Sequence, residues 1–347
     1  MKRYNVFFML FMGIFSLFLS CDNGINSTTI GNNSEGPTFV TAKPDKGFSY
    51  GYYFYIPKNV RQNTYLLVEP NNTGTTSDDI NVHDQKAQNI ISWRRSYADQ
   101  LGVVLLVPVF PRPRSDWQMY THALDRDTLQ NKTGNLARVD LQLIKMIDDF
   151  KEICLSRGIN VNEKILLNGF SASGDFVVRF TAVHPELVKA VASGGSGAEM
   201  ILPISSMEGE RLIYPIGIAD IQEISGKSFN FKQFISIPQY IYLGDLDDNE
   251  SVPFNDAYGD EERRIIIKVL GRDMRDRWEK IKSVYNEQGC KEVVFVSYPG
   301  VGHTITNTMD KDIIDFFKRK IRQITINSEQ ITNLLHCSFF YVLCLIT

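Results

Sequence analysis

This chain of 347 residues has few cysteines and few long apolar runs, and neither sign of charge dominates in it. Five cysteines are too few for a disulfide scaffold in a protein of this length. The 37 basic and 40 acidic residues give a net charge of −3, which offers no electrostatic footprint for a nucleic-acid partner. No metal-spaced cluster of His and Cys occurs, and the glycine-rich segment 194–197 lacks the spacing of a phosphate or dinucleotide loop. The sequence therefore predicts neither a metal nor a cofactor.

What the chain does contain is an alternation of extended and helical patterns from residue 47 onward. Such alternation is typical of βαβ units, so we expect an α/β fold with a mostly parallel central sheet and helices on both faces. One domain is expected over 47–323, with an insertion or cap over 194–234, where regular patterning fades. Strands are predicted at 50–56, 64–68, 103–109, 164–167, 188–192, 240–243 and 293–297, and helices at 90–101, 141–153, 176–183 and 274–286.

The N-terminus has the pattern of an export signal. Lys2 and Arg3 precede an apolar run over 6–19, and Ser20 and Cys21 follow it. The run is shorter than the ~20 residues that span a bilayer, as is typical of a secretory signal. A small residue followed by cysteine at this position resembles the lipobox of bacterial lipoproteins.

That resemblance implies a signal peptide over 1–20 and a lipid on Cys21. The polar segment 21–46 would then be a flexible tether that holds a soluble body at a membrane, on the periplasmic or outer face of a bacterial cell envelope. The alternative is a plain signal peptide that is cleaved nearby. The apolar tail over 324–347 receives no predicted role, and the sequence leaves open whether Cys154 and Cys290 pair.

A candidate nucleophile follows the predicted strand 164–167. The segment NGFSASG places Ser171 in a sharp turn between that strand and the next helix, which is the context of a nucleophile elbow. The residues two positions away must be small, because strand and helix approach each other closely there. Gly169 meets this requirement, and Ser173 stands where a second glycine is usual. The alternative is a tight structural turn.

A serine hydroxyl needs a base to take its proton, and the chain offers five histidines. His303 follows the last predicted strand in a glycine-bearing loop (YPGVGHT), which can turn the imidazole over the edge of the sheet. His184 precedes a proline at a helix end and is expected to be structural, and His336 lies in the tail. His83 and His122 lie in predicted loops and remain candidates for substrate contact.

A carboxylate should hold the imidazole in the right tautomer. The predicted strand 240–243 is followed by GDLDDNE, which contains Asp245, Asp247 and Asp248. Asp245 is expected to shape the turn, whereas Asp247 is the preferred acid and Asp248 the near alternative. An acidic surface loop or a cation site is the other interpretation.

The chain order Ser171, Asp247, His303 resembles that of α/β-hydrolases over roughly 47–320, closest to secreted esterases of the polyhydroxybutyrate-depolymerase and feruloyl-esterase type. Those enzymes place the acid three residues after a glycine and shortly before Val-Pro, which matches Asp247. The resemblance also implies an oxyanion hole made of two backbone N–H groups. These are expected at Ala172 and at Asn72, with Asn71 as the alternative.

The loop after the predicted strand 103–109 should open at the carboxyl edge of the sheet, where ligands bind. Trp117, Tyr120 and His122 are candidates for stacking on a sugar or an aromatic acyl group. An exposed loop that is pinned by its own aromatic side chains is the alternative.

These residues predict a serine ester hydrolase that forms an acyl-enzyme on a small-molecule, carbohydrate or polyester substrate. A prolyl-oligopeptidase-type peptidase is a second hypothesis, although such enzymes usually carry a large propeller domain. A ligand-binding lipoprotein on a degenerate hydrolase fold is the third, and Ser173 and Asn71 motivate it.

Overall fold

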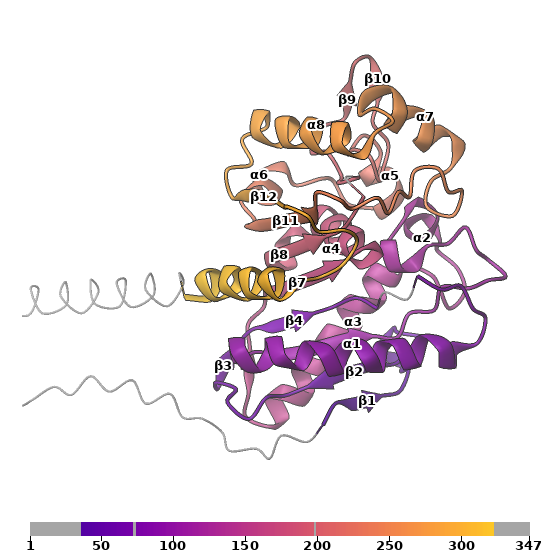
Figure 1. Ribbon diagram of the computed structural model, residues 1–347. Coiled ribbons are helices and arrows are strands. Elements are labelled where there is room, and N and C mark those ends of the chain that lie inside the picture. The colour runs from indigo at the N-terminus through magenta and orange to yellow at the C-terminus, as the bar shows by residue number, and fades with distance from the viewer. Residues whose placement is uncertain (1–35, 72–73, 198, 323–347) are drawn as a thin grey trace, which may run out of the picture.

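The computed structural model describes residues 36–71, 74–197 and 199–322. Its centre is an eight-stranded sheet in the order β1-β2-β5-β4-β7-β8-β11-β12 (Figure 1). The strands β1 and β2 are antiparallel to their neighbours, and the pairs from β5 to β12 are all parallel. The eight strands are β1 (Thr38–Val40), β2 (Tyr52–Tyr55), β4 (Leu66–Val68), β5 (Val104–Pro108), β7 (Ile165–Phe170), β8 (Val188–Gly194), β11 (Gln239–Gly244) and β12 (Val293–Tyr298).

Two short strand pairs lie outside this sheet, and helices cover its faces. The pairs are β3 (Asn63–Thr64) with β6 (Asn160–Val161), and β9 (Ser206–Met207) with β10 (Glu210–Arg211). The helices are α1 (Ile80–Leu101), α2 (Arg126–Gln130), α3 (Val139–Ser156), α4 (Ala172–Val183), α5 (Ile221–Ser225), α6 (Phe231–Ile235), α7 (Asp260–Val269) and α8 (Met274–Glu287), together with a last helix that covers 307–322. The 3-10 turns are η1 (Pro44–Lys46), η2 (Thr121–Ala123) and η3 (Pro185–Leu187).

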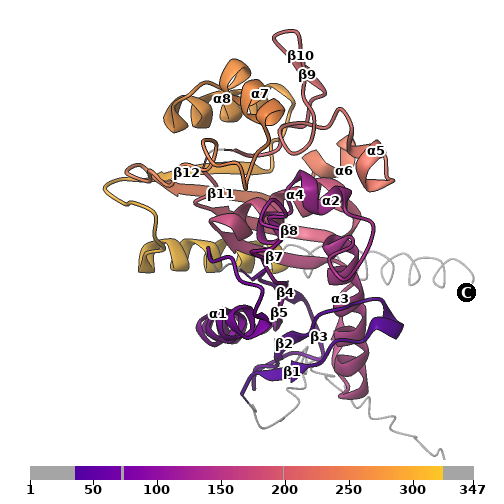
Figure 2. The same cartoon turned by 90° about the vertical axis from the view of Figure 1, so that its right-hand side faces the viewer.

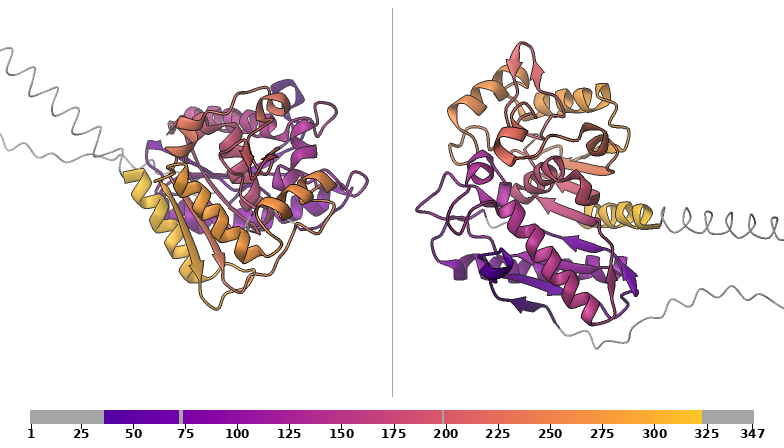
Figure 3. Two further views of the ribbon diagram at one scale, coloured as in Figure 1. Left: turned by 90° about the horizontal axis from the view of Figure 1, so that it is seen from above. Right: turned by 180° about the vertical axis from the view of Figure 1, so that it is seen from behind.

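The side chains of each central strand point alternately into two cores. In β4, Leu66 and Val68 pack in the core beneath α3, α4 and α8, whereas Leu67 packs in the core beneath α1 and the last helix. Figure 2 shows α1 and α3 on opposite sides of the sheet, and the right-hand view of Figure 3 shows α3 crossing its back. A strand buried on both faces needs a continuous apolar run, which explains why the segment 103–109 is apolar without interruption.

The predicted α/β class and the predicted strands are confirmed, with two differences in extent. The sheet starts at β1, so ordered structure begins before residue 47 and takes in part of the segment that was predicted to be a tether. Helix α1 begins at Ile80, whereas the predicted helix began at 90. The prediction missed the first turns because they are polar and show no apolar period. Asp79 caps that start by accepting a hydrogen bond from the amide of Asn81.

The segment over 194–234 is largely irregular, yet it packs against the main core. Leu202, Leu212 and Tyr214 are fully buried there. Cys154 and Cys290 are buried free thiols. The predicted signal peptide, Cys21 and the tail after residue 322 lie outside the described residues. Within the described ranges, no helix is both long and apolar enough for a bilayer span.

Candidate active site

Ser171 lies at the junction of β7 and α4 with a strained backbone. Its φ of 59° and ψ of −132° are sparsely populated by residues other than glycine. The amide of Ser171 donates a hydrogen bond to the carbonyl of Gly194 at the end of β8, at 2.8 Å. This contact fixes the turn against the neighbouring strand, so the hydroxyl is carried at the carboxyl edge of the sheet.

The close approach of β7 and α4 accounts for the small residues around Ser171. A Cβ on Gly169 would lie 2.1 Å from the carbonyl oxygen of Ser173, which no real side chain tolerates. Ser173 is small enough to fit, and its hydroxyl donates to the carbonyl of Phe170 at 2.8 Å and accepts from the amide of Phe170 at 2.9 Å. Serine at this position therefore fastens the turn where the familiar pattern has glycine.

His303 is paired with Asp247. Its Nδ1 lies 3.0 Å and 3.1 Å from the two carboxylate oxygens of Asp247. The Asp247 side chain is 3% exposed and also accepts from the amide of Asn249, whereas the His303 side chain is 25% exposed. A buried carboxylate on Nδ1 leaves Nε2 to take a proton, which is the arrangement that a general base needs.

The acid and histidine loops touch directly. A Cβ on Gly244, the last residue of β11, would lie 1.9 Å from the carbonyl oxygen of Val301, so only glycine lets the two loops meet. Asp245 accepts from the amide of Gly300 at 2.7 Å and so holds the histidine loop, in keeping with its predicted role in shaping a turn. Asp248 is exposed. Of the three aspartates, Asp247 makes the hydrogen bond to His303.

His303 and Ser171 both lie near the end of β8. The rings of His303 and Phe170, the residue before the serine, lie 4.8 Å apart. A Cβ on Gly195 would come within 3.2 Å of Cε1 of His303, and the adjacent Gly194 binds the amide of Ser171. Three loops from β7, β11 and β12 thus converge at one point of the carboxyl edge.

The predicted oxyanion donors are placed in part. Ala172 is the first residue of α4, and amides of a first helical turn have no acceptor within the helix, so its N–H is available beside Ser171. Asn71 is buried after β4, and its side-chain amide donates to the carbonyl of His83 at 3.2 Å. Asn72 lies outside the described residues.

The three candidate substrate contacts, Trp117, Tyr120 and His122, differ in their surroundings. Tyr120 lines a small cavity that also contains Ser171, and Trp117 is 45% exposed. His122 is buried, and its Nε2 lies 2.7 Å from the carbonyl of Phe110. Burial lowers the pKa of His122 to about 3, so it stays neutral. The expected contact by His122 is therefore wrong.

His83 and His184 are structural as well. His83 is fully buried within α1, where its Nε2 lies 2.9 Å from the carbonyl of Ser77, so the expected contact from a loop is also wrong for His83. His184 is buried against Asp140, with its Nε2 2.8 Å from the carboxylate, as expected of a structural residue. Within the described ranges, no group of three or more His, Cys, Asp and Glu side chains could hold a metal.

A buried polar chain beneath the site was not predicted. Glu69, directly after β4, accepts from Asn168 of β7 and pairs with Nε of Arg94 at 2.9 Å. Arg94 in turn lies 3.4 Å from Asp310 of the last helix. Burial raises the pKa of Glu69, and Arg94 opposes that rise. The signal in the sequence was a glutamate and an asparagine at the ends of two apolar strands.

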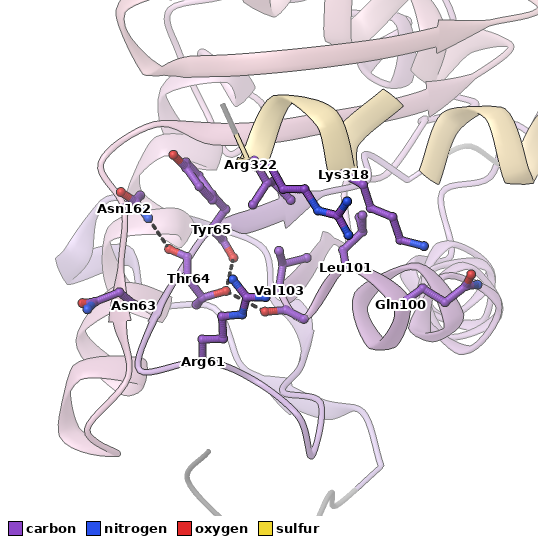
Figure 4. A pocket seen from close by; sticks show the side chains of 12 residues that line it. Arg61, Asn63, Thr64, Tyr65, Gln100, Leu101, Val103, Asn162, Lys318 and Arg322 are labelled. Carbon is purple, nitrogen blue, oxygen red and sulfur yellow. Dashed lines mark hydrogen bonds between the residues drawn. The ribbon is translucent and has the colours of Figure 1, made fainter. Parts of the chain in front are cut away.

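A larger cavity of about 380 Å³ lies at the opposite, amino edge of the sheet (Figure 4). Arg61, Lys318 and Arg322 line it, together with Thr64 and Tyr65 just before β4. It contains neither a candidate nucleophile with a base nor a strained turn, so the candidate chemistry is confined to the carboxyl edge.

Comparison with known proteins identifies the fold. No protein-family model matches the chain, and a search of curated proteins finds no relative. Among solved structures, poly(aspartic acid) hydrolase-1 from Sphingomonas sp. KT-1 aligns with a TM-score of 0.55 at 17% identity, over 82% of this chain and 98% of that one. The poly(3-hydroxybutyrate) depolymerase LpqC from Bordetella parapertussis aligns with a TM-score of 0.49 at 15% identity, over 80% and 87%. The likeness to the first, with the mostly parallel sheet, shows that this chain has the α/β-hydrolase fold, as predicted.

Proposed function

We propose that the protein is a serine ester hydrolase in which Ser171 is the nucleophile, His303 the base and Asp247 the acid. The observation that carries the proposal is the convergence of a serine at a strained strand–helix turn with a hydrogen-bonded histidine–aspartate pair. The order of the three residues along the chain and their positions after β7, β11 and β12 support it.

In the proposed reaction, Nε2 of His303 takes the proton of the Ser171 hydroxyl as the oxygen attacks the ester carbonyl. Asp247 holds Nδ1 and stabilises the imidazolium that forms. The amide of Ala172 and a backbone amide after β4, at Asn72 or Asn71, would stabilise the oxyanion. His303 then gives its proton to the leaving alcohol, and water hydrolyses the acyl-enzyme by the same steps.

The decisive experiment compares the wild-type protein with Ser171→Ala on p-nitrophenyl acetate. We expect the variant to lose at least about 10³-fold in kcat while keeping the wild-type melting temperature. Ser173→Ala is the matched control for a serine in the same turn, and its turnover should fall by no more than about tenfold. Full turnover by purified Ser171→Ala would contradict the proposal.

A fluorophosphonate probe separates catalysis from a degenerate site. We expect the probe to label the wild-type protein at Ser171 and to leave Ser171→Ala unlabelled. A folded wild-type protein that resists the probe would favour the ligand-binding hypothesis. A p-nitroanilide substrate tests the peptidase alternative, and turnover of the anilide at a rate near that of the ester would favour it.

We also propose that Cys21 carries a lipid that anchors the protein at a bacterial envelope membrane. The support is the N-terminal pattern of Lys2, Arg3, an apolar run and a small residue before cysteine. In a bacterial host, Cys21→Ser should move the protein from the membrane pellet to the supernatant, while Cys290→Ser should not. Identical fractionation of wild type and Cys21→Ser would contradict the anchor.

A further inference from the structure

The cavity beside Ser171 is small, and charged and hydroxyl-bearing side chains line it together with alanine and glycine. It has a volume of about 40 Å³, little more than the share of one water molecule. Its described lining contains Ala and Gly but no Val, Leu, Ile, Met, Phe or Trp. Pockets for small molecules are usually lined mainly by such apolar side chains. A group that enters this cavity must therefore be compact and able to form hydrogen bonds.

Ser171, the N-cap of α4, and residues of the helix line this cavity. Asp175 and Arg179 are spaced four residues apart on α4, so their side chains are neighbours on one face of the helix.

Arg179 is held in place by hydrogen bonds. It is 2% exposed, and it donates to the carbonyl of Ala123 at 2.9 Å and to the hydroxyl of Tyr258 at 2.7 Å. Its Nε has no hydrogen-bond partner among the residues that the structure describes. A fixed guanidinium with an unused N–H is a ready donor.

Asp175 is buried but incompletely bonded. It is 8% exposed, and its Oδ1 has no hydrogen-bond partner within the described part of the chain. That oxygen lies 4.0 Å from Nη2 of Arg179, which is too far for a direct hydrogen bond. Burial raises the pKa of Asp175, and Arg179 opposes the rise. Oδ1 thus lacks a donor that would offset its desolvation.

The two unsatisfied groups select a ligand by its hydrogen-bonding groups. A charged group of either sign would be attracted by one of the two side chains and repelled by the other, so the pair gives no net preference for charge. A neutral hydroxyl can donate to Asp175 and accept from Arg179 at the same time. The hydroxyl group also matches the volume of the cavity.

We infer that this cavity is a subsite for a hydroxyl group of the substrate, which lies next to the scissile ester and bridges Asp175 and Arg179. This inference rests on the proposed function, because the subsite is defined relative to Ser171. The favoured substrates are therefore esters of hydroxy acids or of polyols. Analogues without the hydroxyl leave both buried groups unpaired and should react more slowly.

Two matched substrate pairs test the subsite with the full wild-type protein. Ethyl glycolate and ethyl acetate differ by a hydroxyl on the acyl side, and 2-hydroxyethyl acetate and ethyl acetate differ on the alcohol side. Each kcat/KM is measured by titration of the released acid and divided by the rate constant for hydroxide hydrolysis of the same ester. We expect a preference of about 10- to 100-fold for the hydroxylated member of at least one pair.

Substitution of Asp175 should remove that preference. In Asp175→Ala the ratio should fall to within about threefold of unity, mainly through slower reaction of the hydroxylated ester. Asp175→Asn keeps an acceptor oxygen of the same shape and should retain part of the ratio. Asp276→Ala, which changes an exposed aspartate in the first turn of α8, should leave the ratio unchanged.

The outcomes separate the two proposals. Equal corrected kcat/KM values within both pairs, with hydrolysis that depends on Ser171, would overturn the subsite and leave the esterase standing. An unchanged preference in folded Asp175→Ala would also overturn it. Turnover that survives Ser171→Ala would instead overturn the proposed function. If Asp175→Ala does not fold, the wild-type ratios and Asp175→Asn still decide.

Discussion

The cavity at the amino edge of the central sheet and the cavity beside Ser171 at its carboxyl edge are of different kinds. At the amino edge a hollow of about 380 Å³ is lined by Arg61, Lys318 and Arg322, which come from a loop and from the last helix (Figure 4). At the carboxyl edge the cavity beside Ser171 holds only about 40 Å³ and is bounded by loops from several strands. Size alone would direct attention away from Ser171.

The difference follows from the parallel sheet. The parallel strands from β5 to β12 deliver their next residues to one edge, so side chains far apart in sequence meet there. At the amino edge the chain arrives from helices, and the cavity is space left between α1 and the last helix. Convergence of loops and local strain are better guides to chemistry than volume.

The largest difference between variants at the carboxyl edge and variants at the amino edge is expected in turnover. Asp247→Asn should lower kcat by about 10³- to 10⁴-fold, because His303 loses the carboxylate that sets its tautomer. The double variant Arg61→Ala, Lys318→Ala should stay within about twofold of wild type in p-nitrophenyl acetate assays.

Asp248→Asn is the matched control at the carboxyl edge, since it changes an exposed aspartate in the same loop. It should remain within about threefold of wild type. If Asp248→Asn lowers turnover and Asp247→Asn does not, Asp248 is the acid. A large loss of turnover in the double variant would contradict the contrast between the edges.

Glycine substitution gives the next largest contrast, in stability. Gly169→Ala forces a Cβ to within 2.1 Å of a backbone oxygen and should lower the free energy of unfolding by about 3 kcal/mol. Gly102, which borders the amino-edge cavity, has a φ of 66° and would place its Cβ 3.6 Å from the nearest atom. Gly102→Ala should therefore cost only about 1 kcal/mol. Urea unfolding measures both, and equal losses would contradict the crowding argued for the elbow.

The smallest contrast concerns two hydroxyls. Ser173→Ala should lower the unfolding free energy by about 1 kcal/mol and turnover by up to about tenfold, because the elbow loses its fastening. Thr64→Val removes the hydroxyl that donates to the carbonyl of Gly102 at 2.8 Å, at the amino edge. It should cost a similar free energy with no change in turnover. A matching loss of turnover in Thr64→Val would show that both edges act on the reaction.

Much of this arrangement was predictable from local patterns. The strands can be predicted from the sequence because a strand between two helical layers needs an apolar run of fixed length. The turn at Ser171 and the glycine-bearing loop at His303 are also local features. The choice of Asp247 among three aspartates came from resemblance, and the structure brings that residue within hydrogen-bond distance of His303.

Other features depend on contacts that no local pattern encodes. Whether His122 faces the site or the core depends on how the loop after β5 folds back, and burial decides it. No local pattern singles out Asp175 and Arg179, because the burial of Arg179 depends on contacts with Ala123 and Tyr258, which are distant in sequence. The first turns of α1 are polar, so the sequence pattern did not indicate the full length of this helix.

The buried pair of Glu69 and Arg94 has a consequence for how such a sequence can diverge. Removing Arg94 alone leaves Glu69 as a buried carboxylate without its cation, at a cost of about 3–5 kcal/mol. Replacing both by apolar residues of similar volume can be nearly neutral. Descendants of this chain should therefore change the two positions together, and the same constraint extends through Asn168 to the strand that carries Ser171.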